Sequence, residues 1–571
     1  MRLMVSKSKN AQSLYVIKSV FADGKRTSKI VEKLGTYESL QEKLGGQDPI
    51  QWAKEYVKEL NAQEKKLNED VLVRFSPAKQ IPAHQQRSFN GGYLFLQKIY
   101  HELGLNKIAA DISARHRFSF DLNAILSRLL YARILYPSSK LATYQHAAKF
   151  LEPVEFDLHQ IYRALGVLAQ ESDFIQASLY QNSLQLAKRS TGVLYYDCTN
   201  YFFEIEQEDG FRQFGPSKEN RPNPIVQMGL FMDADGIPLA FQIVQGNANE
   251  QTTLIPLEEK ILKDFQHSRF VVCTDAGLAS TANRKFNDQL DRAFITTQSI
   301  KMLKRPLKEW ALSPEGWHLP GSSATYNLTD LDGERHRDYT FYKERWIHEN
   351  GLEQRLIVTF SLKYRDYQRT IRDGQIERAR ALLNTNPARI RKTRQNDYKR
   401  FIRKTACTPD GEVAQTEVYS IDSDIIAAEE RYDGFYGVCT NLEDEVADIL
   451  KVNHRRWEIE ECFRIMKSEF KARPVYLSRK DRIQAHFTTC FLSLVLYRFL
   501  EKRLGGAFTC HEIIQGLQNM NFHEVEKEGY IPTYTRTELT DALHESFGFR
   551  TDYQILKNVQ MKKILKFSKK R

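Results

Sequence analysis

Two apolar, β-prone runs, each followed by an aspartate, constrain the fold of this chain most strongly. Val193–Tyr196 precedes Asp197, and Phe270–Cys273 precedes Thr274 and Asp275. Such runs predict buried strands. Because ligands of open α/β sheets bind outside the carboxyl ends of the strands, we expect the two aspartates to converge there. Each aspartate alone is more often a turn or cap residue than a ligand.

The segment between the two aspartates predicts a hairpin followed by a helix. Ile225–Val244 alternates around Asp235-Gly236, which is a turn signal, and an amphipathic helix is expected from about Thr253 to Phe265. After the second aspartate we expect a tight turn at Gly277, a helix capped by Ser280, and a strand over Ala293–Thr297. This order of elements is that of a ribonuclease H-like sheet.

A third carboxylate lies in Asn453–Lys467, which reads as a helix because it has good helix formers and no Gly or Pro. On a helix, Arg456, Glu460 and Lys467 fall within about 40° of one another. A carboxylate between two cations suits a site for a metal ion and a phosphate. On this segment alone, an ordinary amphipathic helix with an Arg/Glu pair is favoured. With the two aspartates, Glu460 completes an all-oxygen site of the kind that Mg²⁺ or Mn²⁺ prefers.

These blocks resemble the DDE transposases of insertion sequences, in the insertion-sequence-four-like group with a Tyr-Arg-Glu-Lys signature. Arg456, Glu460 and Lys467 match the signature spacing, whereas Asn453 stands at the tyrosine position. The similarity covers roughly residues 90–505. Its other blocks are Tyr196–Thr199, Gly246-Asn247 with Glu250, Thr274–Ser280, Arg482–Phe487 and Arg133–Lys140.

The resemblance implies an α/β fold: a ribonuclease H-like catalytic core with a mostly β insertion, preceded by a largely helical region. It also implies an enzyme that cuts the ends of a mobile element and joins them to target DNA. Two Mg²⁺ or Mn²⁺ ions, about 3.5–4 Å apart, are expected as cofactors. Asp197, Asp275 and Glu460 are then the catalytic residues and the metal ligands, with Asp197 bridging both ions.

The same resemblance implies the contacts to DNA. Arg456 and Lys467 are expected to hold the phosphates beside the scissile bond. Trp457 is expected to stack on an unpaired base, although packing in the core is an equally good interpretation. The implied partners are double-stranded DNA, as inverted-repeat ends and as target, and a second copy of the chain in a paired-end complex.

Composition agrees with a polyanionic partner. The 571 residues carry a formal net charge of +11 and a pI near 9.0. Seven cysteines without a Cys-x-x-Cys pair predict reduced thiols. No signal peptide is recognised, and the apolar segment Phe487–Leu500 is too short to span a bilayer. Taken with the resemblance to insertion-sequence transposases, which implies a prokaryotic protein, we expect a cytoplasmic, nucleoid-associated location and no membrane partner.

Five regions are expected along the chain. They are a basic N-terminal region (1–75), a helical region that could bind DNA ends or serve as a scaffold (76–190), the first part of the core (191–300), a mostly β insertion (301–435), and the completion of the core with the catalytic and C-terminal helices (436–571). Within them we predict a hairpin over Ser13–Leu34 around Asp23-Gly24, helices over Pro49–Leu67, Asp121–Leu135 and Ser172–Ala187, and a basic stretch at Arg389–Lys404.

Two other functions remain open. The chain could be a ribonuclease H-like, metal-dependent nuclease without strand transfer, or an inactive DNA-binding relic. For the third carboxylate, Glu458 and Glu461 are the nearest alternatives, but they point about 160° and 100° away from Glu460 around a helix. A metabolic enzyme is not expected, because the sequence has no phosphate-binding glycine loop and no set of activated nucleophiles.

Overall fold

The computed structural model describes residues 1–7, 12–22, 25–67, 70–73, 75–153, 155–289, 291–385, 397–407 and 413–570. The chain divides into two compact units. One unit combines residues 1–94 with residues 519–570, and the other comprises residues 95–518. The carboxylates predicted from the sequence all lie in the second unit.

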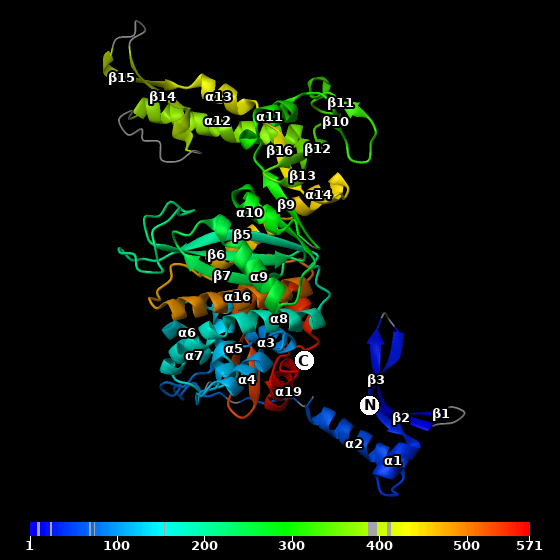
Figure 1. Cartoon of the computed structure of the whole chain (residues 1–571). Coiled ribbons are helices and arrows are strands. Elements are labelled where there is room, and N and C mark those ends of the chain that lie inside the picture. Colours follow the sequence, from blue (N-terminus) through cyan, green and yellow to red (C-terminus); the bar gives the residue numbers. More distant parts are fainter. Residues whose placement is uncertain are drawn as a thin grey trace. The chain divides into compact units, whose positions relative to one another are not determined.

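A mixed sheet of ten strands, counted over the described residues, organises the second unit (Figure 1). Its order is β11-β10-β12-β13-β16-β9-β8-β5-β6-β7. The strands are β5 (Val193–Phe202), β6 (Ile225–Asp233), β7 (Pro238–Gln245), β8 (Phe270–Thr274), β9 (Arg292–Gln298), β10 (Trp317–His318), β11 (Thr325–Tyr326), β12 (Phe341–Glu349), β13 (Leu352–Phe360) and β16 (Phe435–Thr440).

The middle of this sheet follows the predicted hairpin and crossover. Strands β5, β6 and β7 are antiparallel neighbours, whereas β8 runs parallel to both β5 and β9. The predicted helix after the hairpin is α9 (Leu254–Asp264). It lies between β7 and β8 in the chain and makes the crossover from the antiparallel to the parallel part of the sheet.

The two faces of β5 have different neighbours. Tyr196 and Cys198 belong to an apolar cluster with α9, and Tyr196 donates or accepts a hydrogen bond with Thr253 at 2.7 Å. Tyr201 points to the other face, where its ring packs on Phe487 at 4.7 Å. Because side chains alternate along a strand, Asp197 and Thr199 share the face of Tyr201.

Helices before and after the sheet build the rest of the core. Those before it are α3 (Tyr93–Glu102), α4 (Leu105–Arg115), α5 (Leu122–Leu135), α6 (Lys140–Ala147), α7 (Leu158–Gln170) and α8 (Ser172–Leu186). Those after β8 include α10 (Thr281–Phe286), α14 (Val446–His454), α15 (Trp457–Arg464), α16 (Lys480–Arg503) and α17 (Cys510–Asn519).

Figure 1 shows α8 and α16 beside the edge of the sheet formed by β6 and β7. Phe241 of β7 packs on Phe491 of α16 with ring centroids 4.9 Å apart.

Helix α16 contains the apolar segment singled out in the sequence. By length and composition it could cross a membrane, but 94% of its apolar window is buried within the described structure. The long buried run from Ile483 to Leu500 is therefore typical of a core helix.

The segment between residues 301 and 435 is less rich in strands than the expected mostly β insertion. Its strands β10 to β13, and β16 that follows it at the boundary, extend the central sheet, and β14 (Ile402–Cys407) pairs with β15 (Val413–Ile421). The same segment carries α11 (Arg305–Leu312), the 24-residue α12 (Leu362–Thr385) and α13 (Ser423–Glu430). Residues 386–396, which include the first half of the predicted basic stretch, lie outside the described residues.

The first unit holds two small sheets. One contains β1 (Arg2–Lys7), β2 (Gln12–Ala22) and β3 (Lys25–Thr36), and it is followed by α1 (Tyr37–Lys43) and α2 (Pro49–Leu67). The turn at Asp23-Gly24 lies outside the described residues. The other contains β4 (Ser88–Asn90), β17 (Asn521–Val525), β18 (Gly529–Pro532) and β19 (Leu556–Lys557), with α18 (Glu538–Phe547) and α19 (Asn558–Ser568). The C-terminal end was expected to be helical, and its pairing with β4 was not predicted.

Candidate active site

The first carboxylate, Asp197, lies inside a strand. The sequence placed it where the strand stops, but β5 continues to Phe202 and Asp197 pairs with Leu230 across the sheet. The polar residues at 197, 199 and 200 concealed the continuation, because a strand covered on both sides was expected to stay apolar. Only 9% of Asp197 is exposed. Its Oδ1 accepts a hydrogen bond from the amide of Cys198 at 2.7 Å.

Asp275 lies immediately after β8, as predicted. Its side chain accepts a hydrogen bond from the amide of Leu278 at 3.0 Å and so caps a short 3₁₀ turn. In the parallel pairing of β5 with β8, Tyr195 stands opposite Cys273. Two residues further along this register, Asp275 stands opposite Asp197. Neighbouring strands lie about 4.8 Å apart, so the two carboxylates belong to one site.

The charges around Asp197 support this placement. The pKa of Asp197 is raised to about 6, chiefly by burial and in part by the negative charge of Asp275. Lys218 and Arg456 act in the opposite direction and lower the pKa of Asp197. Asp275, Lys218 and Arg456 therefore all lie close enough to Asp197 to interact with it electrostatically.

The predicted helix over Asn453–Lys467 is broken in the structure. Helix α14 ends at His454, α15 starts at Trp457, and a π-helix covers Ile465–Glu469. The amide of Arg456 bonds to the carbonyl of Asn453 at 3.3 Å rather than to that of Val452. The Val452 carbonyl instead accepts a hydrogen bond from the Tyr195 hydroxyl at 3.0 Å. The Val452 carbonyl also accepts a hydrogen bond from the Arg455 amide at 3.1 Å, so the chain turns here although the segment contains no Gly or Pro.

Glu460 still lies next to Arg456 despite this break. The Arg456 Nη1 and the Glu460 Oε1 are 3.8 Å apart, and the Glu460 side chain is 62% exposed. Burial alone would lower the pKa of Arg456, but Tyr436, Asp275 and Asp197 outweigh it and raise that pKa. Arg456 therefore interacts with all three predicted carboxylates.

The two neighbouring carboxylates of α15 have other partners. Glu458 pairs with Arg455 at 3.0 Å. Glu461 pairs with Arg464 at 3.3 Å and with Arg498 at 3.5 Å. Of the three acids on this helix, Glu460 is the one that contacts Arg456.

Lys467 reaches the same face of the sheet from the π-helix. Its Nζ donates a hydrogen bond to the Thr199 Oγ1 at 2.6 Å and lies 3.6 Å from Glu219. Burial and the nearby Lys218 lower the pKa of Lys467 to about 8, although Asp197 acts to raise it. Lys467 and Arg456 therefore both interact with the charge of Asp197.

Trp457 does not pack in the core. It is 53% exposed, at the first position of α15. The residue is therefore accessible to solvent, one turn before Glu460 on the same helix.

The donor set suits a hard divalent cation. All three predicted ligands are carboxylates, and oxygen is what Mg²⁺ and Mn²⁺ prefer. In the described part of the chain, Asp197 and Asp275 form no ion pair within 4 Å, and each accepts a single hydrogen bond, from a main-chain amide. Most of their lone pairs are thus left for a cation.

Comparison with known proteins identifies the family. The transposase DDE domain matches residues 202–496, which is more than half of the 571 residues. The chain belongs to this family. The matched range contains Asp275 and Glu460 and begins five residues after Asp197.

Two solved transposase structures show a distant likeness. The piggyBac transposase synaptic complex with hairpin DNA is 8% identical, with a TM-score of 0.36 over 76% of this chain and 82% of that one. The Mos1 transposase paired-end complex with left transposon end is 12% identical, with a TM-score of 0.13 over 41% and 64% of the two chains. Scores this low carry no argument about the present chain. No curated protein matches it.

Three residues of this DDE transposase were missed in the sequence. Lys218 donates a hydrogen bond to the Cys198 carbonyl and lies 3.7 Å from Glu250. The hydroxyl of Tyr436, on β16, accepts a hydrogen bond from Asn453 at 3.1 Å and lies 2.7 Å from the Thr297 hydroxyl. Glu219 pairs with Lys467 and Arg473. These residues come from a loop and a distant strand, so no local spacing marks them.

A pocket of about 650 Å³ opens beside the turn after Asp275. Its lining includes Lys218, Asn247, Glu250 and Gly277. Gln227 fixes the loop over it by donating hydrogen bonds to the carbonyls of Gly246 and Ala248, at 2.9 and 2.7 Å. The block around Gly246 and Glu250, noted in the sequence, thus shapes the surroundings of the site.

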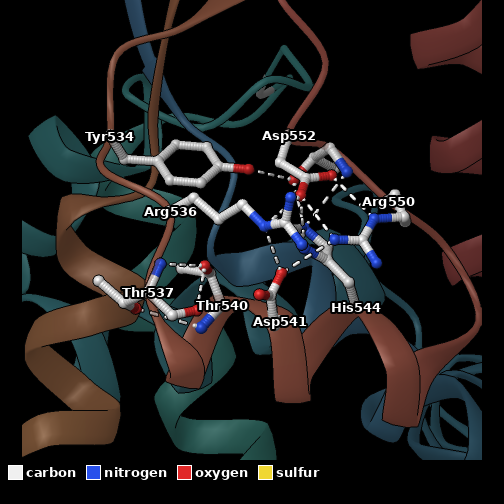
Figure 2. A network of polar contacts seen from close by, with 9 residues as sticks. Tyr534, Arg536, Thr537, Thr540, Asp541, His544, Arg550 and Asp552 are labelled. Carbon is white, nitrogen blue, oxygen red and sulfur yellow. Dashed lines mark hydrogen bonds and ion pairs between the residues drawn. The ribbon is translucent and has the colours of Figure 1, made fainter.

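A second carboxylate cluster, in the first unit, is already neutralised. Asp541, His544 and Asp552 offer ligand atoms within 4.8 Å of one another. Figure 2 shows Arg550 reaching both carboxylates, at 2.9 and 2.7 Å, with Arg536 beside Asp541 at 2.7 Å. Burial lowers the pKa of His544 to about 4. Two guanidinium groups therefore take the place that a metal would need, and this cluster is structural.

Proposed function

We propose that this DDE transposase cuts the ends of a mobile DNA element and joins them to target DNA. Support for the proposal comes from Arg456, whose Nη1 lies 3.8 Å from the Glu460 Oε1 and whose pKa is raised by Asp275 and Asp197. We infer that these three carboxylates are the catalytic residues and hold divalent ions, two Mg²⁺ or Mn²⁺. When bound, such ions activate the attacking oxygen and stabilise the leaving one.

The side chains around the carboxylates have separate tasks in this proposal. Arg456 and Lys467 bind phosphate oxygens on either side of the scissile bond, because both cations interact with the charge of Asp197. When DNA draws Arg456 away from Glu460, the exposed Glu460 carboxylate becomes free to act as a ligand. Trp457 stacks on an unpaired base, and its exposed ring supports this role.

We also propose the finer assignment to a ribonuclease H-like core and to the Tyr-Arg-Glu-Lys group. Support for the core comes from the order β7-β6-β5-β8-β9, in which the first three strands are antiparallel and the last two run parallel to β5. Support for the group comes from the spacing of Arg456, Glu460 and Lys467. The hydroxyl of Tyr436 next to Asn453 supplies a tyrosine where the signature lacks one.

The partners follow from the proposed reaction. They are double-stranded DNA, as inverted-repeat ends and as target, and a second copy of the chain when two ends are paired. A cytoplasmic, nucleoid-associated location in a prokaryote would suit these partners.

A strand-transfer assay tests the proposal. Wild type and Asp275→Asn are incubated with Mg²⁺, target plasmid and a pre-cut end carrying the inverted repeat that flanks the gene. The proposal predicts end-joined product with wild type and none with the variant, while both bind the end. Cleavage of uncut ends without any joining by the wild type would favour a nuclease without strand transfer. Binding without either reaction would favour an inactive relic.

A further inference from the structure

A second pocket in the catalytic unit is lined by cations. It has a volume of about 440 Å³ and lies between the end of α5, the start of α6 and the loop before α16. Arg133, Lys140, Lys471 and Arg473 line it, and no carboxylate does so among the described residues. We call it the Lys140 pocket.

Lys140 is the unusual member of this pocket. It is only 5% exposed, and it has neither an ion pair nor a side-chain hydrogen bond within the described structure. Burial and the charge of Arg133 lower the pKa of Lys140 to about 7, whereas Cys490 acts to raise it. An unpaired ammonium in such a place destabilises the fold unless an anion joins it.

The other cations have structural partners or reach solvent. Arg133 is 4% exposed and donates hydrogen bonds to the carbonyls of Phe470 and Ser138, at 3.1 and 3.2 Å. Those two bonds connect the walls of the pocket. Because carbonyl groups carry no net charge, the positive charge of the Arg133 guanidinium stays uncompensated. Arg473 pairs with Glu219, and Lys471 is exposed at the rim.

Among the described residues next to Lys140, neither His486 nor Cys490 supplies the missing negative charge. The His486 Nε2 donates a hydrogen bond to the Ala472 carbonyl at 3.1 Å, and burial lowers the pKa of His486 well below its ordinary value. Burial also raises the pKa of the Cys490 thiol. Both groups are therefore neutral near pH 7, and the pocket keeps its positive charge.

We propose that the Lys140 pocket holds a phosphodiester group of bound DNA. This inference rests on the proposed function, which supplies DNA as the partner. A phosphate brings the anion that Lys140 lacks, and the hydroxyls of Ser138 and Tyr162 in the lining can donate to its oxygens. The contact is to the backbone, so it positions DNA without reading its sequence.

The test compares Lys140→Met with Lys149→Met in the full chain, since Lys149 is an exposed lysine just after the same helix. Affinity for a fluorescent duplex carrying the flanking inverted repeat is measured by anisotropy, without divalent ions, over a range of salt. Loss of one phosphate contact should weaken binding about tenfold near 0.1 M salt and reduce the slope of log K against log salt by about 1. Lys149→Met should bind as wild type does.

A thermal melt of the same proteins separates this role from a structural one. Lys140→Met should melt no lower than wild type, because it removes an unpaired buried charge and keeps the apolar stem. A lower melting temperature together with weaker binding would overturn the proposal, since it would show that Lys140 supports the fold. Equal losses of affinity in both variants would also overturn it, since they would reflect net charge alone.

The last outcome concerns the source of the phosphate. If Lys140→Met binds DNA as wild type does, while inorganic phosphate raises the melting temperature of wild type alone, the pocket takes a free anion and the DNA assignment is wrong. The binding assay needs neither metal nor cleavage. A chain that binds the repeat through Lys140 but never cuts it would therefore contradict the proposed function and leave this inference standing.

Discussion

Asp197 is buried in the strand that carries the proposed chemistry, and its protonation should control activity. The pKa of this carboxyl is about 6 in the free protein, raised by burial. Below that pH the carboxyl holds a proton and competes poorly for a divalent ion. At subsaturating Mg²⁺ we expect log(kcat/KM) for cleavage to be flat above about pH 7 and to fall with decreasing pH through about 6. A rate that stays constant from pH 8 to pH 5 would contradict this role.

The buried carboxyl of Glu258 should make the stability of the protein depend on pH. It is fully buried in α9, where it accepts a hydrogen bond from Asn287 at 3.1 Å, and burial raises its pKa to about 8. The folded protein thus retains a proton that the unfolded chain loses near its ordinary pKa. The stability that this carboxyl contributes is present at low pH and is lost as the pH rises through about 8.

Glu258→Gln should remove this loss. We expect the variant and wild type to melt alike near pH 5, and the variant to be more stable by an order of 1 kcal/mol at pH 8. The exposed neighbour Glu259→Gln is the matched control and should change little at either pH. Equal melting temperatures of Glu258→Gln and wild type at pH 8 would show that the carboxylate is stabilised by contacts that the structure does not contain.

At the scale of the element, close packing under β5 should limit what the central sheet tolerates. A Cβ on Gly229 of β6 would lie 2.2 Å from the hydroxyl of Tyr196, which is hydrogen-bonded to Thr253. Gly229→Ala must displace that ring and should destabilise the protein by about 1–3 kcal/mol. The control is Gly192→Ala, just before β5, where an added Cβ meets nothing within 4 Å. Denaturant unfolding of both variants measures the difference, and equal stabilities would show that the sheet is loosely packed here.

The elements also show where sequence reasoning succeeds. The hairpin of β6 and β7, α9, β8 and the Ser280 cap were predictable because turn residues and apolar periodicity mark them locally. The break between α14 and α15 was not, because no Gly or Pro marks it and the Tyr195 hydroxyl that bonds to the Val452 carbonyl comes from a distant strand. Lys218 and Tyr436 could not be predicted either, because they approach the carboxylates only in the folded chain and lie in no local sequence motif.

The extent of the sheet is another property that local patterns do not show. Runs such as Gln354–Phe360 predict a strand, but not that β13 pairs with β16 and so extends the sheet that carries Asp197. Likewise, no pattern in the C-terminal sequence predicts that β17 pairs with β4, which lies more than 400 residues earlier. Pairing between distant segments is decided by the packing of the whole unit.

In the whole molecule, the proposed reaction requires that Asp197, Asp275 and Glu460 hold the catalytic ions together while DNA is bound. The three acids on α15 allow a sharp comparison, because Glu458, Glu460 and Glu461 lie on one helix and differ in their partners. Replacing a carboxylate that holds a catalytic metal should slow the reaction by at least about 10³-fold. Glu458 and Glu461 have partners outside the proposed set, so replacing either should leave the rate nearly unchanged at equal DNA occupancy.

The most direct test is Mg²⁺-dependent cleavage of DNA carrying the inverted repeats that flank the gene. Wild type is compared with Glu458→Gln, Glu460→Gln and Glu461→Gln at equal DNA occupancy. We predict cleavage at the repeat ends by wild type and by the Glu458 and Glu461 variants, and none by Glu460→Gln. Undiminished cleavage by Glu460→Gln would contradict the account, because the carboxylate beside Arg456 would then not belong to the catalytic set.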